Sequence, residues 1–155
     1  MPKNKKPKIF KISQNGLFKT PYSLPKEQKQ DIEPHIMTEY EFLLIQKLKP
    51  AIESKQLIKF WYEDTTTNFS DWRIVEPHLI GQTNYKHENI WLVAWFLPTS
   101  SQISNGHAPD WKTYILDNVK KLEILEDRYK FTKPNYNIKD KRMKTIYCAT
   151  SYYVQ

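Results

Sequence analysis

The stretch ENIWLVAWF, residues 88–96, contains two tryptophans and a phenylalanine within six positions. Because side chains alternate along a strand, Trp91, Val93 and Trp95 fall on one face. The alternate residues fall on the other face and are also apolar: Ile90, Leu92, Ala94 and Phe96. Both faces of this predicted strand are therefore apolar. Two interpretations follow: the segment is a core strand and nothing more, or its aromatic face lines a binding site.

Four other segments have the period-two alternation of strands, and the links between most of them are short. They are QLIKFWYE (56–63), DWRIVEPHLI (71–80), DWKTYILD (110–117) and VKKLEIL (119–125). With the opening stretch, read as 89–97, they predict a mainly β fold: a small, strongly bent barrel of five strands. The longest link, 98–109, is turn-rich. We expect the core to contain Ile58, Phe60, Val75, Leu92, Ala94, Leu116 and Leu122.

A helix is predicted ahead of the barrel, over residues 38–55. Thr38 and Glu41 have the spacing of a capping box, in which each residue bonds the other's backbone N–H. The apolar face of the helix is predicted from positions three or four apart: Phe42, Ile45, Leu48 and Ile52. Pro50 cannot donate a backbone hydrogen bond, so we expect a kink or a division of the helix near Lys49.

The net charge of +7 is concentrated at the two ends of the chain. Residues 1–26 carry seven lysines and no acid, and residues 127–155 carry seven basic and two acidic residues. Residues 37–126 hold nine basic and twelve acidic residues. We therefore expect three parts: a basic extended arm (1–36) with a short edge strand at KIFKI (8–12), a helix and barrel (37–127), and a basic, aromatic C-terminal extension (128–155). Terminal positive charge suits an anionic partner such as nucleic acid, or it serves solubility alone.

The composition favours a cytoplasmic chain that is not an enzyme. A single cysteine, Cys148, cannot form an internal disulfide. No apolar run approaches the roughly 20 residues of a membrane span, and the basic N-terminal residues lack the apolar segment of a signal peptide. The four histidines have no metal-ligand spacing, and three glycines supply no phosphate-binding loop. We therefore expect no metal site, no cofactor, no membrane partner and no catalytic residues.

The order of several blocks resembles the WYL domain, a bacterial domain with an Sm/SH3-like barrel. The blocks are AIESKQLIKFWYED, RIVEPHLI, IWLVAW, KTYILDNVKKLEIL and YKFTKPNYN, and the resemblance covers about residues 48–137. The tripeptide that names the family corresponds to Ile90, Trp91 and Leu92, with Trp95 at the aromatic position that follows. No second helical pattern precedes Thr38, so the resemblance is to a divergent, stand-alone domain without a helix-turn-helix.

The resemblance implies a regulatory, ligand-sensing module for transcription whose ligand is a nucleotide or single-stranded nucleic acid. Its ligand meets the aromatic strand and arginines on the last strands. This chain keeps one of those basic positions as Lys112, whereas Ile115 and Asn118 occupy the other two. The residues predicted to bind the ligand are Trp91, Trp95, Arg73, Lys112 and His78. Further contacts to nucleic acid are predicted from the C-terminal extension: Arg128, Lys130, Lys133, Tyr136, Lys141 and Arg142.

A different class of function stays open beside this one. Five tryptophans are more than a barrel of five short strands needs for its core, and tryptophan is common at the centres of protein interfaces. The alternative is therefore a scaffold for protein–protein contacts or for a homodimer, without a nucleic-acid ligand.

Overall fold

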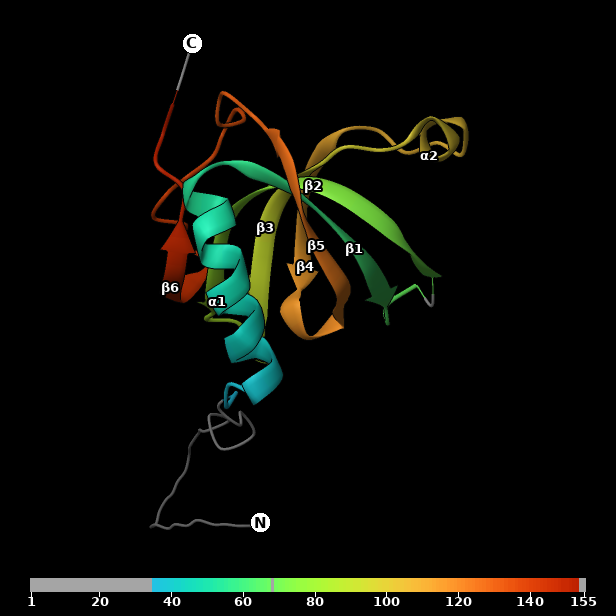
Figure 1. Cartoon of the computed structure of the whole chain (residues 1–155). Coiled ribbons are helices and arrows are strands. Elements are labelled where there is room, and N and C mark those ends of the chain that lie inside the picture. Colours follow the sequence, from blue (N-terminus) through green and yellow to red (C-terminus); the bar gives the residue numbers. More distant parts are fainter. Residues whose placement is uncertain (1–34, 68, 154–155) are drawn as a thin grey trace, which may run out of the picture. The chain divides into compact units, whose positions relative to one another are not determined.

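The computed structural model describes residues 35–67 and 69–153, and they form a mainly β fold with one helix ahead of a six-stranded sheet (Figure 1). The predicted arm and its edge strand at 8–12 lie outside the described residues. The elements follow in this order: α1 (Glu39–Glu53), β1 (Gln56–Asp64), β2 (Phe69–Thr83), β3 (Ile90–Phe96), α2 (Ser100–Ser104), β4 (Asp110–Ile115), the 3-10 turn η3 (Leu116–Asn118), β5 (Val119–Arg128) and β6 (Met143–Ala149).

The capping box predicted for the start of α1 is confirmed. The Thr38 hydroxyl accepts from the Glu41 amide at 3.1 Å, and Glu41 Oε1 accepts from the Thr38 amide at 2.9 Å. The predicted division near Lys49 is wrong, because α1 continues through Pro50 to Glu53. Pro50 lies in the last turn, where its missing N–H removes only one of the final hydrogen bonds.

One side of α1 packs against the sheet, beside β6, β1 and β2 (Figure 1). Ile45, Leu48 and Ile52 are buried there, as their spacing predicts. Phe42, predicted for the same face, is instead 50% exposed, and Leu44 is buried. The buried stripe therefore runs through positions 41, 44–45, 48 and 51–52, one side of a helix at its natural 3.6-residue period.

The five predicted strands are present, and the sheet contains a sixth that the sequence did not predict. All pairings are antiparallel, in the order β4–β3–β2–β1–β5, with β6 on β2. β1 pairs with the first half of β2 and β6 with the second half, so the 15-residue β2 connects the whole sheet. No pairing joins β4 to β5 among the described strands, so the predicted closure into a barrel is not confirmed.

β6 can approach β2 closely because residue 81 is glycine. A Cβ added to Gly81 would lie 2.8 Å from the Thr145 carbonyl oxygen and 2.8 Å from Met143 Sδ. The side chain of Met143 can move aside, but the carbonyl belongs to the paired strand. Residues 143–149, which were predicted to belong to a C-terminal extension, therefore pair in the main sheet through a position without a side chain.

The core lies between α1 and the sheet. Six of the seven predicted core residues are fully buried there: Ile58, Phe60, Val75, Leu92, Ala94 and Leu116. Leu122 is partly buried at the margin of the same cluster. The turn-rich link 98–109 contains a helix that the sequence did not predict, α2, which begins with a second capping box from Thr99 and Gln102.

Candidate functional site

The aromatic face of β3 lies on the side of the sheet away from the core. Ile90, Leu92, Ala94 and Phe96 are buried in the core, so Trp91, Val93 and Trp95 face the other way. Paired residues of antiparallel strands share a face. We call this surface the outer face, and it consists of Trp91, Val93, Trp95, Glu76, Leu79, Gly81, Trp111, Thr113 and Ile115.

A bulge in β2 adds His78 to the outer face. Pro77 pairs with Ala94 but Leu79 pairs with Val93, so two residues of β2 stand opposite one of β3. Such an extra residue leaves the ladder and re-aims its side chain. His78 therefore lies beside Leu79 on the outer face, where the chain that follows β5 covers it.

Residues 129–142, here called the covering segment, cross the outer face between β5 and β6. Tyr129 begins the segment: its amide donates to the Lys55 carbonyl at 2.9 Å and its hydroxyl to the Pro77 carbonyl at 2.6 Å. A turn follows at Lys133–Tyr136, where Asn135 has φ +70° and the Tyr136 amide donates to the Lys133 carbonyl. Proline followed by asparagine at positive φ is typical of a type II turn.

The covering segment buries His78 completely. The His78 ring stacks on Tyr129 at 4.9 Å between centroids and meets the edges of Trp111 and Tyr136 at 4.8 and 4.9 Å. The Lys133 amide can only donate, so Nε2 of His78 accepts from it at 3.3 Å. Nδ1 therefore carries the proton and donates to the Glu76 carbonyl at 2.9 Å. Burial lowers the pKa of His78 to about 4, so the ring is neutral at neutral pH.

Trp111 connects the covering segment to the aromatic strand. Its ring meets Trp95 edge to face at 5.6 Å and lies nearly parallel to Tyr136 at 6.2 Å. Its indole N–H donates to the Pro134 carbonyl at 2.7 Å. The sequence placed Trp111 among the barrel tryptophans without giving it a role at the site.

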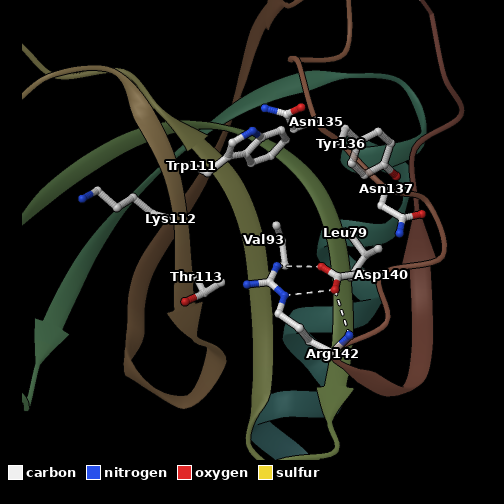
Figure 2. A pocket seen from close by; sticks show the side chains of 10 residues that line it. All are labelled: Leu79, Val93, Trp111, Lys112, Thr113, Asn135, Tyr136, Asn137, Asp140 and Arg142. Atoms are coloured by element: carbon white, nitrogen blue, oxygen red, sulfur yellow. Dashed lines mark hydrogen bonds and ion pairs between the residues drawn. The ribbon is translucent and has the colours of Figure 1, made fainter.

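An open cavity of about 470 Å³ lies between the outer face and the covering segment (Figure 2). Leu79 and Val93 form its apolar floor, and Figure 2 shows Trp111 and Tyr136 on one side and the Asp140–Arg142 pair on the other. We call it the outer cavity, and it is lined by Leu79, Val93, Trp111, Lys112, Thr113, Asn135, Tyr136, Asn137, Asp140 and Arg142. Aromatic rings, two amides and a guanidinium therefore meet in one hollow.

Arg142 is held in a fixed position beside Trp91. Its Nε and Nη2 donate to the two oxygens of Asp140 at 3.0 and 2.6 Å, and its guanidinium lies 5.5 Å from the centre of the Trp91 ring. The hydrogen bond from Arg142 holds the pKa of the Asp140 carboxyl below its usual range. This pair orients the guanidinium but offsets its charge.

Several of the predicted basic residues differ in what they contact. Lys133 forms an ion pair with Glu76 at 2.6 Å, and Lys144 forms one with Glu88 at 3.1 Å. Within the described part of the chain, four exposed basic residues from the end of β5 to the start of β6 form no ion pair: Arg128, Lys130, Lys139 and Lys141. These four leave positive charge on the covering segment and the residue before it.

Two of the predicted ligand residues have side chains that do not point into the outer cavity. Arg73 pairs with Phe60, a core residue, and its guanidinium lies about 6 Å from the rings of Tyr62 and Phe96. Lys112 pairs with the core residue Ala94, and Figure 2 shows its side chain extending away from the outer cavity. The structure therefore brings together Trp91, Trp95, His78, Tyr136 and Arg142 and places Arg73 on the opposite face.

The sequence missed other residues of the outer cavity, namely Asn135, Asn137 and Asp140. The Pro134–Asn135 pair was a usable signal for a turn. Nothing in the sequence indicated that this turn would return to β3. Among residues 35–67 and 69–153, no group of three or more histidine, cysteine or acidic side chains is placed to hold a metal ion. In the same ranges, no helix is long and apolar enough to cross a membrane.

Comparisons with known proteins found few similarities. No protein-family model matches the chain, and no curated protein matches it. Among solved structures, it is similar to the proteasome accessory factor B/C (PafBC) of Arthrobacter aurescens, with a TM-score of 0.49 and 17% sequence identity. The similarity covers 68% of this chain and 15% of PafBC, so this chain corresponds to a small part of that protein.

Proposed function

We propose that the chain is a non-catalytic, regulatory binding module of the WYL type, with an Sm/SH3-like fold, that binds single-stranded nucleic acid or a nucleotide on its outer face. The observation that carries the proposal is the outer cavity, where Trp111, Tyr136 and Arg142 meet beside lysines that form no ion pair within the described residues. Any base can stack on an aromatic ring, whatever the sequence of the nucleic acid, and the phosphate of that nucleotide needs positive charge nearby. A role in transcriptional regulation and a cytoplasmic location belong to the same proposal.

Base stacking and positive charge come from different parts of this surface: Trp91 supplies a ring for stacking, and the covering segment supplies the charge. The Trp91 ring is half-buried, with Tyr85 at 5.6 Å and Arg142 at 5.5 Å, so it offers a partly open aromatic surface. Lys139 and Lys141 are exposed on the covering segment and form no ion pair within the described residues, because the Asp140 carboxylate between them is bonded to Arg142. Stacking changes affinity at every salt concentration, whereas phosphate contacts change the salt dependence.

The test is a titration of labelled single-stranded oligonucleotides and of a nucleoside monophosphate at two or more salt concentrations. Trp91→Ala is expected to weaken oligonucleotide binding by about 1–3 kcal/mol with the salt slope unchanged. Lys139→Ala with Lys141→Ala is expected to flatten the slope by about 0.7 for each phosphate that is no longer neutralised. Lys49→Ala is the control, because Lys49 is exposed on α1, away from the outer face.

The outcomes are distinguishable. Binding of the mononucleotide as tightly as the oligonucleotide would assign a nucleotide ligand. An absence of binding to both at low salt would end the proposal. Truncation after Asp127 is unsuitable as a test, because it removes β6 and uncovers His78.

A second function, self-association, is favoured by an exposed apolar group at the start of α1. Ile36, Phe42 and Leu43 are 82%, 50% and 56% exposed. Exposed tryptophan does not support self-association. Trp72 is 38% exposed, and the other four tryptophans are more buried. Sedimentation velocity over a hundredfold concentration range is expected to show a dimer that Leu43→Glu dissociates; a monomer throughout would remove this candidate.

A further inference from the structure

A second cavity is lined mainly by residues on the core side of the sheet, shares Lys112 and Thr113 with the lining of the outer cavity, and also reaches Trp91 and Ile115. It has a volume of about 480 Å³ and lies among β1, β2, β3, β4 and the β1–β2 turn, beside α2. We call it the inner cavity. Its lining includes Tyr62, Arg73, Phe96, Gln102, Lys112 and Tyr114. Ligand cavities in proteins typically have volumes of about 300–1,000 Å³.

Tyr114 lines this cavity and has a buried hydroxyl without a hydrogen-bond partner among the described residues. Its side chain is 4% exposed, and its Oη has no hydrogen-bond partner among the described residues. The ring is fixed by edge-to-face contacts with Phe60 at 5.1 Å and Tyr62 at 4.9 Å. A buried hydroxyl without a partner is costly and rare, so an external partner is the simplest account of it. Burial also holds the pKa of Tyr114 above its usual range, so the hydroxyl keeps its proton and can donate.

The neighbouring acids are already bonded to other groups. Asp71 accepts from the Trp72 amide at 2.8 Å and from Gln102 Nε2 at 3.1 Å, and its carboxylate is 3.9 Å from Arg73. Asp64 accepts from the Thr66 and Thr67 amides at 2.9 and 3.2 Å. Asp64, which lines the cavity, and Asp71 beside it are therefore engaged by donors from the chain, which favours a ligand that brings its own acceptor.

One cation of the cavity, Arg73, lies beside aromatic walls. The Arg73 guanidinium lies 6.0 Å from the Tyr62 ring centre and 5.9 Å from the Phe96 ring centre. Lys112 is exposed at the rim and forms no ion pair within the described residues. The lining holds two cations, Arg73 and Lys112, and one acid, Asp64, a balance of one positive charge that suits a monoanion better than a phosphate dianion, and the rings suit an apolar body.

We propose that the inner cavity binds a small organic carboxylate, whose oxygens accept from Tyr114 Oη and pair with Arg73 while its apolar body packs on Phe96 and Tyr62. This site goes beyond the function proposed for the outer face, and its test does not rely on that function. The single charge and the ring-lined walls make an aromatic monocarboxylate the best-matched simple ligand.

The probe is benzoate, with benzyl alcohol as a neutral analogue of the same shape. Titration into the full-length protein, followed by amide shifts in two-dimensional NMR, is expected to show saturable binding of benzoate at residues of the inner cavity. Tyr114→Phe removes only the hydroxyl and is expected to weaken benzoate binding about tenfold or more, the usual effect of removing a hydrogen bond to a charged group. Tyr153→Phe is the matched control, because that residue is exposed and does not line the inner cavity.

Thermal unfolding separates a ligand role from a structural one. Because Tyr114 Oη has no internal partner, Tyr114→Phe is expected to unfold at the wild-type temperature or above it without benzoate, and to lose the benzoate-induced rise. A variant that is clearly less stable without benzoate would show that the hydroxyl serves the fold and would overturn the proposal. The proposal is also overturned if benzoate does not bind, or if benzyl alcohol binds equally well.

Discussion

His78→Ala is expected to lower the free energy of unfolding by about 3–5 kcal/mol, although the residue lies outside the main core. The ring is fully buried between Tyr129, Trp111 and Tyr136, so its removal leaves a cavity where three aromatic rings now meet. The substitution also leaves the Glu76 carbonyl and the Lys133 amide without their partner. Buried polar groups that lose a partner keep the full cost of their desolvation.

The measurement is urea denaturation followed by circular dichroism, with His87→Ala as the matched control. His87 is exposed in the turn between β2 and β3, so its replacement is expected to change stability by less than about 0.5 kcal/mol. Oligonucleotide binding on the outer face is expected to fall together with stability, because His78 supports the covering segment. A reduction of less than about 1 kcal/mol would show that His78 does not hold that segment in place.

The pH dependence of stability tests the burial of His78 without removing its side chain. The pKa of His78 is about 4 in the folded protein and near its ordinary 6.5 in the unfolded chain, because burial disfavours the charged ring. The unfolded chain therefore takes up a proton first as the pH falls. The contribution of His78 to the free energy of unfolding is fully present above pH 6.5. It falls by about 3 kcal/mol between pH 6.5 and 4, and His78 causes no further loss below pH 4. His78→Gln, which cannot titrate, is expected to lack this part of the profile; an unchanged profile would contradict the assignment.

Leu92→Ala is expected to lower the free energy of unfolding by about 2–5 kcal/mol. Leu92 is fully buried on the core side of β3, opposite Ile80 on β2 and Tyr114 on β4. The effect combines the transfer free energy of the removed carbons with the cavity that they leave. The side chain faces away from the outer cavity, so oligonucleotide binding by the folded fraction should be unchanged.

Chemical denaturation at constant pH measures this effect, with Ile103→Ala as control. Ile103 is a similar aliphatic residue but 56% exposed on α2, so its truncation is expected to cost less than about 1 kcal/mol. Equal reductions in the two variants would mean that β3 is not packed as described.

Much of the local structure could be predicted from the sequence, because its causes lie within a few residues. Thr38 and Glu41 bond each other across one turn of helix, so their spacing alone predicts where α1 begins. The alternation in β3 is equally local, and it correctly separated the buried Leu92 from the half-buried Trp91. The aromatic half of the candidate site was therefore predictable from residues 88–96.

The rest depended on contacts between distant parts of the chain. β6 was missed because its seven residues directly follow a basic stretch and were grouped with it, and its place in the sheet depends on close approach at Gly81, more than sixty positions earlier. The bulge that brings His78 to the outer face is one extra residue in β2 relative to its partner β3. The sequence of either strand alone does not reveal it.

The sequence by itself determined the helix start, the strand that bears Trp91 and Trp95, most of the core, and a basic, aromatic C-terminal region. Only the tertiary structure decided that this region folds back over His78, and that Arg73 belongs to the inner cavity. Strand register assigns a side chain to one face or the other, and a shift of one residue reverses that assignment. Register is set by pairing across the whole sheet, so the composition of the two cavities could not be obtained from any single segment.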